Sequence, residues 1–377
     1  MQEKAIIARA ICAMSGGVDS SVAAALMLEK DYQCVGITLK LYKEESSRSS
    51  AGCCSLADVN DARNVAYNLG MDHYVLNFTD EFDKYVVRHF IDTYEAGGTP
   101  NPCIECNRHI KFNLLLLRAC QLDFDFLVTG HYARITNDSS TGRYLLHKAL
   151  DEKKDQSYVL YCLTQKQLQK SIFPLGSLTK NVVRKIAESK NLVNASKSES
   201  QDICFVPDGK YADFIENYTG KTYPPGDIID LNGNIIGKHK GLIRYTIGQR
   251  RGLGVAANTP VYVAAKSVAA NTVTLAADDV MDAVSASNDT TFANPLYSKS
   301  LIANDINLIA CSGIKKPMRV MVKTRYLQAA QSAVVEQIDE GSLRIDFDSP
   351  QRAITPGQAA VMYDGDIVIG GGTICQF

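Results

Sequence analysis

The chain has 377 residues, 46% of them hydrophobic and 21% charged, and these ordinary globular values exclude a disordered polypeptide, a collagen-like repeat and a coiled coil. At roughly 150 residues per domain, this length predicts two or three domains. The 40 Lys and Arg residues balance 41 Asp and Glu residues to a net charge of −1, so a nucleic-acid partner has to bind a local basic face.

The first 150 residues alternate short β-rich runs with helical patterns. Strands are predicted at 6–14, 34–41, 74–78 and 126–129, and helices at 20–30, 56–69, 81–94 and 107–121. This alternation predicts an α/β fold with a parallel sheet, whose ligands bind at the carboxyl ends of the strands. Helical patterns at 165–171 and 180–190 extend this domain to about residue 210.

The second half of the chain has a sequence pattern that is typical of β structure. From Tyr223 onward, Pro-Gly and Asn-Gly turns separate short alternating runs at 259–263 and 272–275, as in hairpins. The polar stretch 285–291 is predicted as a linker, and the β-rich runs after it predict a closed or sandwiched unit. The predicted domains are therefore 1–210, an α/β parallel-sheet domain, followed by two small β domains at 211–292 and 293–377.

Cysteine usage and the lack of long apolar runs predict a cytoplasmic protein that does not enter a membrane. No run approaches the roughly 18 residues that cross a bilayer, and the apolar stretch 5–14 is broken by Arg9, unlike the core of a signal peptide. Eleven cysteines in such a chain favour thiol chemistry or metal binding over a disulfide framework. Six of them lie in apolar runs and are expected to be small buried core residues: Cys12, Cys34, Cys120, Cys162, Cys311 and Cys375.

The segment SGGVDSS at 15–21 stands between the first predicted strand and the first predicted helix. Its glycines let backbone N–H groups approach an anion, its serines add hydroxyl donors, and the helix directs its positive end to the same point. The alternative is a tight Gly-Gly turn with a helix cap that binds nothing. The segment lacks the Lys-Ser/Thr of a Walker A loop. It resembles the SGGxDS signature of the PP-loop ATP pyrophosphatases, which split ATP into AMP and pyrophosphate while adenylating a substrate oxygen.

Two further segments carry thiols in polar surroundings. In 100–107, Cys103 and Cys106 form a C-x-x-C at the mouth of a predicted helix, where the dipole favours a thiolate, so Cys106 is a candidate nucleophile or ligand. A zinc ribbon would need a second C-x-x-C, and Cys53 and Cys54 are adjacent instead. In 200–205, Cys204 is a single cysteine on a polar loop. Each segment alone is also compatible with incidental cysteines.

Taken together, the sequence resembles the bacterial and mitochondrial tRNA-specific 2-thiouridylases along nearly the whole chain. The resembling segments are SGGVDSS from 15, CCS and DA within 53–62, TPNP and CNRHIKF within 99–112, TGHYAR from 129, KDQSY from 154, SQDICF from 200, GKHKGLIRYTIGQRRGLG from 237, RY at 325 and PGQ from 356. The resemblance implies that the enzyme replaces O2 of the wobble uridine of tRNA by sulfur. ATP with Mg²⁺ would adenylate this oxygen and release pyrophosphate and AMP, and a cysteine persulfide would deliver sulfur.

The resemblance also implies site residues. It gives catalytic roles to Asp19, to Cys106 as nucleophile and to Cys204 as persulfide carrier. The implied ATP-binding residues are Ala13, Met14, Ser15, Gly16, Gly17, Val18, Asp19, Ser20, Ser21, Leu39 and Gly130, with the adenine packing on Leu39. The implied tRNA contacts are Asn101, Pro102 and Cys103 at the target base, and His131, Lys154, Asp155, Gln156, Arg325, Tyr326 and Gln358 elsewhere. Without the resemblance, His131 would be interpreted as structural, Lys154 and Asp155 as a surface ion pair, and Tyr326 as core.

One departure leaves the sulfur chemistry open. Many relatives have Asp where this chain has Cys103, so the alternative to direct persulfide transfer is an iron–sulfur cluster on Cys103, Cys106 and Cys204. The implied partners are tRNAs that accept Glu, Gln and Lys, and an upstream persulfide donor such as a cysteine desulfurase or a relay protein. Two rival functions are another PP-loop adenylating synthetase and a non-catalytic RNA-binding protein. Phosphate contacts are expected from basic residues of the two β domains: Lys238, Lys240, Arg244, Arg250, Arg251, Lys323 and Arg325.

Overall fold

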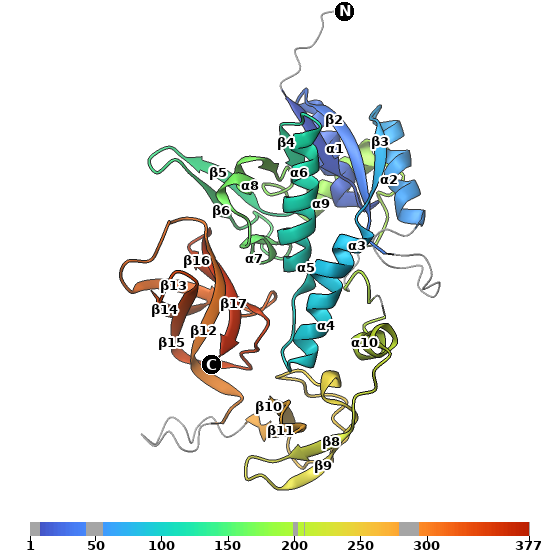
Figure 1. Cartoon of the computed structure of the whole chain (residues 1–377). Coiled ribbons are helices and arrows are strands. Elements are labelled where there is room, and N and C mark those ends of the chain that lie inside the picture. The colour runs from blue at the N-terminus through green and yellow to red at the C-terminus, as the bar shows by residue number, and fades with distance from the viewer. Residues whose placement is uncertain (1–7, 43–55, 199–202, 207, 279–293, 377) are drawn as a thin grey trace, which may run out of the picture.

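The computed structural model describes residues 8–42, 56–198, 203–206, 208–278 and 294–376 (Figure 1). Cys53, Cys54 and the predicted linker 285–291 lie outside these residues. Within them the strands form an α/β sheet near the N-terminus, a small central sheet, and a C-terminal barrel beside the α/β part. No helix of the described residues is both long and apolar enough to cross a membrane.

The N-terminal sheet is parallel, with the strand order β3-β2-β1-β4-β7. Its strands are β1 (Arg9–Ala13), β2 (Gln33–Lys40), β3 (His73–Asn77), β4 (Phe126–Val128) and β7 (Ser171–Ile172). The first four confirm the predicted strands. The short edge strand β7 was not predicted.

Apolar residues on both faces of this sheet explain its layers. Along β1, Ile11 faces one hydrophobic cluster while Ala10 and Cys12 face the other, because successive side chains of a strand point to opposite faces. The helices α1 (Val18–Glu29), α2 (Leu56–Asn68) and α9 (Lys180–Ser189) contribute to the cluster of Ala10. These helices confirm the patterns at 20–30, 56–69 and 180–190.

Two longer helical segments cover the opposite face. One runs through α3 (Thr79–Phe82), the π-helical turns η1 (Asp83–Val87) and α4 (Arg88–Glu95). The other runs through α5 (Pro102–Glu105), the π-helical turns η2 (Cys106–Leu115) and α6 (Leu116–Gln121). The predicted start at residue 107 was therefore five residues late: Pro102 is the first helical residue, where its missing N–H costs nothing. Short helices α7 (Ser157–Leu160), α8 (Gln165–Gln169) and α10 (Tyr211–Thr219) follow.

The central sheet has the order β10-β11-β8-β9. It is built from β8 (Gly226–Ile229), β9 (Ile235–His239), β10 (Val261–Ser267) and β11 (Thr272–Ala277), with the 3-10 turn η3 (Leu242–Arg244) between β9 and β10. β8 and β9 form a hairpin, as do β10 and β11, which confirms the predicted hairpin pattern.

The C-terminal strands close into a barrel because β12 pairs with both β15 and β17. The barrel strands are β12 (Tyr297–Leu308), β13 (Met318–Lys323), β14 (Gln331–Gln337), β15 (Ser342–Arg352), β16 (Ala359–Asp364) and β17 (Ile367–Gln376). An unpredicted hairpin, β5 (Arg134–Asp138) and β6 (Arg143–His147), extends this sheet through the pairing of His147 with Ile367. The N-terminal and C-terminal parts therefore share a sheet.

Candidate active site

The SGGVDSS loop joins β1 to α1 at the carboxyl end of the strand, and its hydroxyl groups hold it in shape. The Ser20 hydroxyl donates to the Gly17 carbonyl at 3.0 Å and accepts from the Ser15 N–H at 3.2 Å. The buried Ser21 hydroxyl also donates to the Gly17 carbonyl, at 2.9 Å. The hydroxyl groups of Ser20 and Ser21 therefore stabilise the loop itself. An anion at this site would accept hydrogen bonds from the backbone N–H groups in the first turn of α1.

Two positions of the site require glycine because the backbone of another segment lies too close for a side chain. Gly16 has a φ of +75°, and a Cβ there would lie 2.3 Å from the carbonyl oxygen of Asp58 in α2. A Cβ at Gly130 would lie 2.8 Å from the carbonyl carbon of Asp19. Gly130 follows β4, so the structure brings it directly against the loop at the same edge of the sheet.

The other predicted nucleotide positions lie along this edge. Ala13 ends β1, and the N–H of Met14 donates to the Ile37 carbonyl at 2.8 Å. The buried Leu39 is the penultimate residue of β2. The carboxyl ends of neighbouring parallel strands meet at one edge, so Ala13, Met14, Leu39 and Gly130 gather beside the loop as the sequence predicts.

Asp19 is held by residues that the sequence analysis did not identify. The ammonium of Lys180, the first residue of α9, lies 2.7 and 2.8 Å from the two carboxylate oxygens, and the Tyr132 hydroxyl donates to one of them at 2.8 Å. Lys180 is only 8% exposed. A cation in the first turn of a helix interacts unfavourably with the helix dipole. Lys180 at the start of the predicted helix 180–190 is such a cation, and this unfavourable placement is the sequence signal that could have indicated a functional role.

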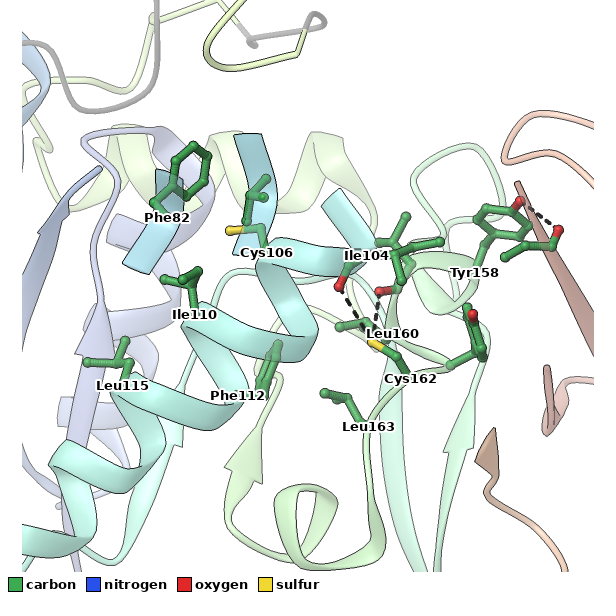
Figure 2. Packing of buried hydrophobic residues seen from close by; sticks show 14 of the residues in the cluster. Phe82, Ile104, Cys106, Ile110, Phe112, Leu115, Tyr158, Leu160, Cys162 and Leu163 are labelled. Carbon is green, nitrogen blue, oxygen red and sulfur yellow. Dashed lines mark hydrogen bonds between the residues drawn. The ribbon is translucent and has the colours of Figure 1, made fainter. Parts of the chain in front are cut away.

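The two cysteines of the C-x-x-C differ in environment. Cys103 is exposed in the first turn of α5. Cys106, which Figure 2 shows among the buried residues, is 9% exposed and begins the next turn. The helix dipole therefore favours a thiolate at Cys103 more than at Cys106, which corrects the expectation from the predicted helix start. Between them, burial opposes ionisation of Glu105, yet a hydrogen bond from His109 and the charge of Arg108 bring the pKa of Glu105 below its usual value.

Cys204 and Cys106 contact the same hydrophobic cluster. The neighbouring Phe205 ring packs edge-on against Phe82 of α3 with centroids 5.8 Å apart, and η2, which Cys106 begins, also packs against α3. Cys204 itself is partly exposed and packs on the hydrophobic cluster that contains Cys106. Two cysteines that lie about 100 positions apart in sequence thus contact one hydrophobic cluster.

The remaining cysteines divide differently from the expectation. Cys12, Cys34 and Cys162 are buried as predicted. Cys311 is partly exposed, and Cys120 and Cys375 are exposed. The prediction of burial was therefore wrong for Cys120 and Cys375, because an apolar run does not say which face of a helix or strand a residue occupies.

Several predicted tRNA contacts shape the loop after β4. The buried Asp155 carboxylate accepts from the Ala149 N–H at 3.0 Å and from the Ser157 hydroxyl at 2.8 Å, so it is not the surface ion pair considered from the sequence. The Gln156 side chain accepts from the Tyr132 N–H at 3.0 Å. The contact of Gln156 thus supports Tyr132, which in turn donates to Asp19.

His131 and Lys154 border the same loop. The His131 ring is buried, its Nδ1 lies 2.7 Å from the Thr129 hydroxyl, and burial lowers the pKa of His131 well below its usual value. The Lys154 N–H donates to the Asp151 carbonyl at 3.0 Å. A neutral, buried imidazole is suited to positioning rather than to binding phosphate.

Residues of the barrel brace the segment before Cys103. The Gln358 amide donates to the carbonyls of Thr99 and Pro100 at 2.9 and 3.2 Å, and the Thr99 N–H donates to the Pro356 carbonyl at 2.8 Å. This contact fixes the approach to Asn101 and Pro102, the N-cap and first residue of α5. The motifs TPNP and PGQ, far apart in sequence, are thus one structural unit.

Arg325 and Tyr326 lie at junctions between parts of the fold. The Arg325 guanidinium donates to the carbonyls of Ala353 and, at 3.4 Å, Ile247 of the central part. Burial raises the pKa of Tyr326 to about 12, and the charges of Asp155 and Cys103 add to this effect. The Tyr326 ring lies with its centroid 6.0 Å from that of Tyr158 in α7.

The thiols do not form a metal site in this arrangement. Among the described residues, which include Cys103, Cys106 and Cys204, no group of three His, Cys, Asp or Glu side chains is placed to hold a metal ion.

Three known domain families match successive parts of the chain. Residues 8–208 match a family described as tRNA methyl transferase HUP domain, residues 212–277 a tRNA methyl transferase PRC-barrel domain, and residues 298–374 an aminomethyltransferase beta-barrel domain. An α/β domain followed by two β domains confirms the predicted fold class. An NMN synthetase from Francisella tularensis aligns with 58% of this chain and 79% of its own at a TM-score of 0.33 and 16% identity, and no argument rests on so low a likeness.

Full-length relatives are much closer. The tRNA-specific 2-thiouridylase MnmA of Acetivibrio thermocellus is 48% identical over 364 residues, which cover 96% of this chain and 97% of the relative. The protein of the same name from Clostridioides difficile is 45% identical over 96% of each chain. The chain therefore belongs to the tRNA-specific 2-thiouridylase family of tRNA-modifying enzymes.

Proposed function

We propose that this enzyme adenylates O2 of the wobble uridine of tRNA with ATP and then replaces that oxygen by sulfur from a persulfide on Cys204. The observation that carries the proposal is the convergence of two functional groups at the same end of one parallel sheet. The SGGVDSS loop follows β1. At α3, which follows β3, the helical segment that begins with Cys106 makes contact, and Phe205, the neighbour of Cys204, packs against Phe82.

Asp19 and Lys180 support the adenylation half of the reaction. Asp19 offers a carboxylate at the start of α1, and a carboxylate with phosphate oxygens suits Mg²⁺, which would neutralise phosphate charge when bound. In this state Lys180 neutralises Asp19 instead. We propose that Lys180 turns to the phosphates when Asp19 holds the metal, so that the site keeps a cation beside each anion.

The thiols support the second half. The terminal sulfur of the Cys204 persulfide attacks C2 of the adenylated uracil, and the bond from C2 to the oxygen carried by AMP breaks. The Cys106 thiolate then attacks Sγ of Cys204, and the S–S electron pair stays on the sulfur now bound to C2. The products are the 2-thiouridine, AMP and a Cys106–Cys204 disulfide, which an external dithiol reduces.

The partners of the proposed reaction are tRNAs that accept Glu, Gln and Lys, together with a persulfide donor such as a cysteine desulfurase or a relay protein. The predicted target-base residues Asn101, Pro102 and Cys103 stand at the start of α5, one turn before Cys106. We also propose a cytoplasmic location, because the substrate is tRNA and the proposed cycle needs reduced thiols.

The decisive experiment incubates the enzyme with ATP, Mg²⁺, tRNA and a persulfide donor, followed by mass analysis of the tRNA nucleosides. The proposal expects 2-thiouridine at the wobble position and one AMP per thiolation. Pyrophosphate release without tRNA would favour another PP-loop synthetase, and tRNA binding without ATP turnover would favour a non-catalytic binding protein. Either result would contradict the proposal.

The cluster alternative has its own test. Anaerobic purification with iron and sulfide analysis, followed by thiolation assays of iron-free and reconstituted enzyme, separates the two routes. The persulfide proposal expects full activity without iron. Activity that requires about four irons per chain and is lost in Cys103→Ala would contradict it.

A further inference from the structure

The segment after α9 contacts the backbone of the SGGVDSS loop from behind. The Asn194 side chain is only 3% exposed, and its amide nitrogen lies 2.9 Å from both the Gly16 carbonyl oxygen and the Ser21 hydroxyl. The Lys197 ammonium reaches the same Gly16 carbonyl at 3.3 Å. Two donors from one segment therefore hold a single carbonyl of the loop.

Lys197 also connects this carbonyl to α2. Its ammonium lies 2.7 Å from an oxygen of Asp58 and 2.6 Å from an oxygen of Asp61. Although burial acts in the opposite direction, the hydrogen bonds and charges of Asp58 and Asp61 raise the pKa of Lys197, so the ammonium stays charged. The loop, α2 and the segment after α9 are thus joined at one nitrogen atom.

The geometry of the peptide bond gives these contacts a consequence for anion binding. In a planar trans peptide the C=O and the following N–H point in opposite directions. Holding the Gly16 carbonyl toward Asn194 and Lys197 therefore turns the Gly17 N–H away from them. This peptide lies between two glycines, and Gly16 has a φ of +75°, so it can rotate more freely than any peptide between residues with side chains.

We propose that Asn194 and Lys197 are positioning residues that hold the Gly16–Gly17 peptide with its N–H toward the phosphates of ATP. The proposal rests on the proposed function of the loop. Without these donors the peptide samples orientations that present a carbonyl oxygen to the phosphates, which repels them. Neither residue touches the reacting atoms, and their effect is expected on ATP affinity.

The test compares binding of a non-hydrolysable ATP analogue to Lys197→Met, Lys197→Arg and Asn194→Ala. Lys190→Met is the matched control, because Lys190 lies in the same region and pairs with Glu29 at the far end of α1. Lys197→Met and Asn194→Ala should weaken analogue binding about tenfold, in line with the loss of a hydrogen bond to a charged or buried group. Lys197→Arg keeps charge and donors and should bind within a few fold of wild type, like Lys190→Met. Affinity for tRNA should stay unchanged in all four.

A further variant separates peptide orientation from simple charge repulsion. Lys197→Met leaves Asp58 and Asp61 unpaired near the loop, and combining it with Asp58→Asn and Asp61→Asn removes their charges. The proposal expects this triple variant to remain weak. Recovery of wild-type analogue affinity would overturn it, as would wild-type affinity in both Lys197→Met and Asn194→Ala. If wild-type enzyme itself failed to bind the analogue, the proposed function of the loop would fail instead.

Discussion

At the scale of single residues, Asp19 depends on partners from distant parts of the chain. Tyr132 follows β4 and Lys180 begins α9, and both reach the carboxylate at hydrogen-bond distance. Because the carboxylate is paired with an almost buried ammonium, removing either one leaves a charge in a partly desolvated site. A substitution of Asp19 is therefore expected to change the local stability as well as the proposed use of ATP.

We expect Asp19→Ala to lower tRNA-dependent release of AMP at least about 100-fold, the scale of losing one preorganised electrostatic group. The fold should persist, since the loop and Lys180 lie at the edge of the sheet. Release of AMP and pyrophosphate with and without tRNA measures the activity, and thermal melting checks the fold. The double variant Asp19→Ala with Lys180→Met should melt higher than Asp19→Ala alone without regaining activity. Normal AMP release by Asp19→Ala would remove the residue from the ATP site.

A second prediction for single residues concerns the three cysteines of the proposed site. Cys204→Ser and Cys106→Ser should stop formation of 2-thiouridine while still releasing pyrophosphate with tRNA, because the proposed adenylate forms before sulfur arrives. Cys103→Asp should keep most of the activity, since the Cys103 side chain is exposed at the helix start and the proposed sulfur transfer uses only Cys106 and Cys204. Nucleoside mass analysis and pyrophosphate release are measured on the same samples, with the exposed Cys375→Ser as control. Thiolation by Cys204→Ser would contradict the persulfide assignment.

At the scale of elements, the position of α5 depends on the barrel as well as on its own sequence. Gln358 holds the carbonyls of Thr99 and Pro100, just before α5. Another contact joins the same parts of the fold, since the Tyr158 hydroxyl of α7 donates to the Ala359 carbonyl at 2.9 Å (Figure 2). The helix that carries both cysteines of the C-x-x-C is thus positioned across the boundary between two parts.

Gln358→Ala tests whether this brace or a tRNA contact is the main role of the residue. As a brace, its loss should reduce the free energy of unfolding by about 1 kcal/mol per hydrogen bond and slow thiolation, with tRNA affinity changed less than twofold. Denaturant unfolding and tRNA filter binding give the two numbers. Gln331→Ala is the control, because its amide donates only locally, to Ala329. A large loss of tRNA affinity at unchanged stability would assign Gln358 to the tRNA instead.

Elements with a local pattern were the ones that the sequence could predict. The spacing of apolar residues predicts the strands β1 to β4 and the helices α1, α2 and α9. The residue types of the SGGVDSS segment predict the loop between β1 and α1. The hairpin β5–β6 was missed because its place is decided by pairing with β17, over 200 residues later. Lys180, Asn194 and Lys197 were missed for the same reason, since their partners Asp19 and Gly16 lie far away in sequence.

At the scale of the whole molecule, polar contacts tie the three parts together. Arg244 of the central part pairs with Asp213 and Glu216 of α10, and Arg325 joins the barrel to Ile247. We propose the division 1–210, 211–292 and 293–377 for the domains, with β5–β6 shared by the first and the last. Arg244, predicted as a phosphate contact, is engaged within the protein in this state, whereas Arg250 and Arg251 are exposed.

Arg250 and Arg251 therefore carry the prediction for tRNA binding by the central part. Reversing both charges, Arg250→Glu with Arg251→Glu, should weaken tRNA binding and flatten its salt dependence, because a protein that neutralises fewer phosphates releases fewer counterions. The slope of log K against log salt should fall by about one for each phosphate that is no longer neutralised. The matched control reverses Arg319 and Arg344 on the barrel, which pair with Asp348 and Asp346 and change the net charge equally. Binding is measured at several salt concentrations for wild type and both variants. If the control flattened the slope as much as the Arg250 and Arg251 variant, the effect would be one of net charge, and the central part would not be the tRNA-binding surface.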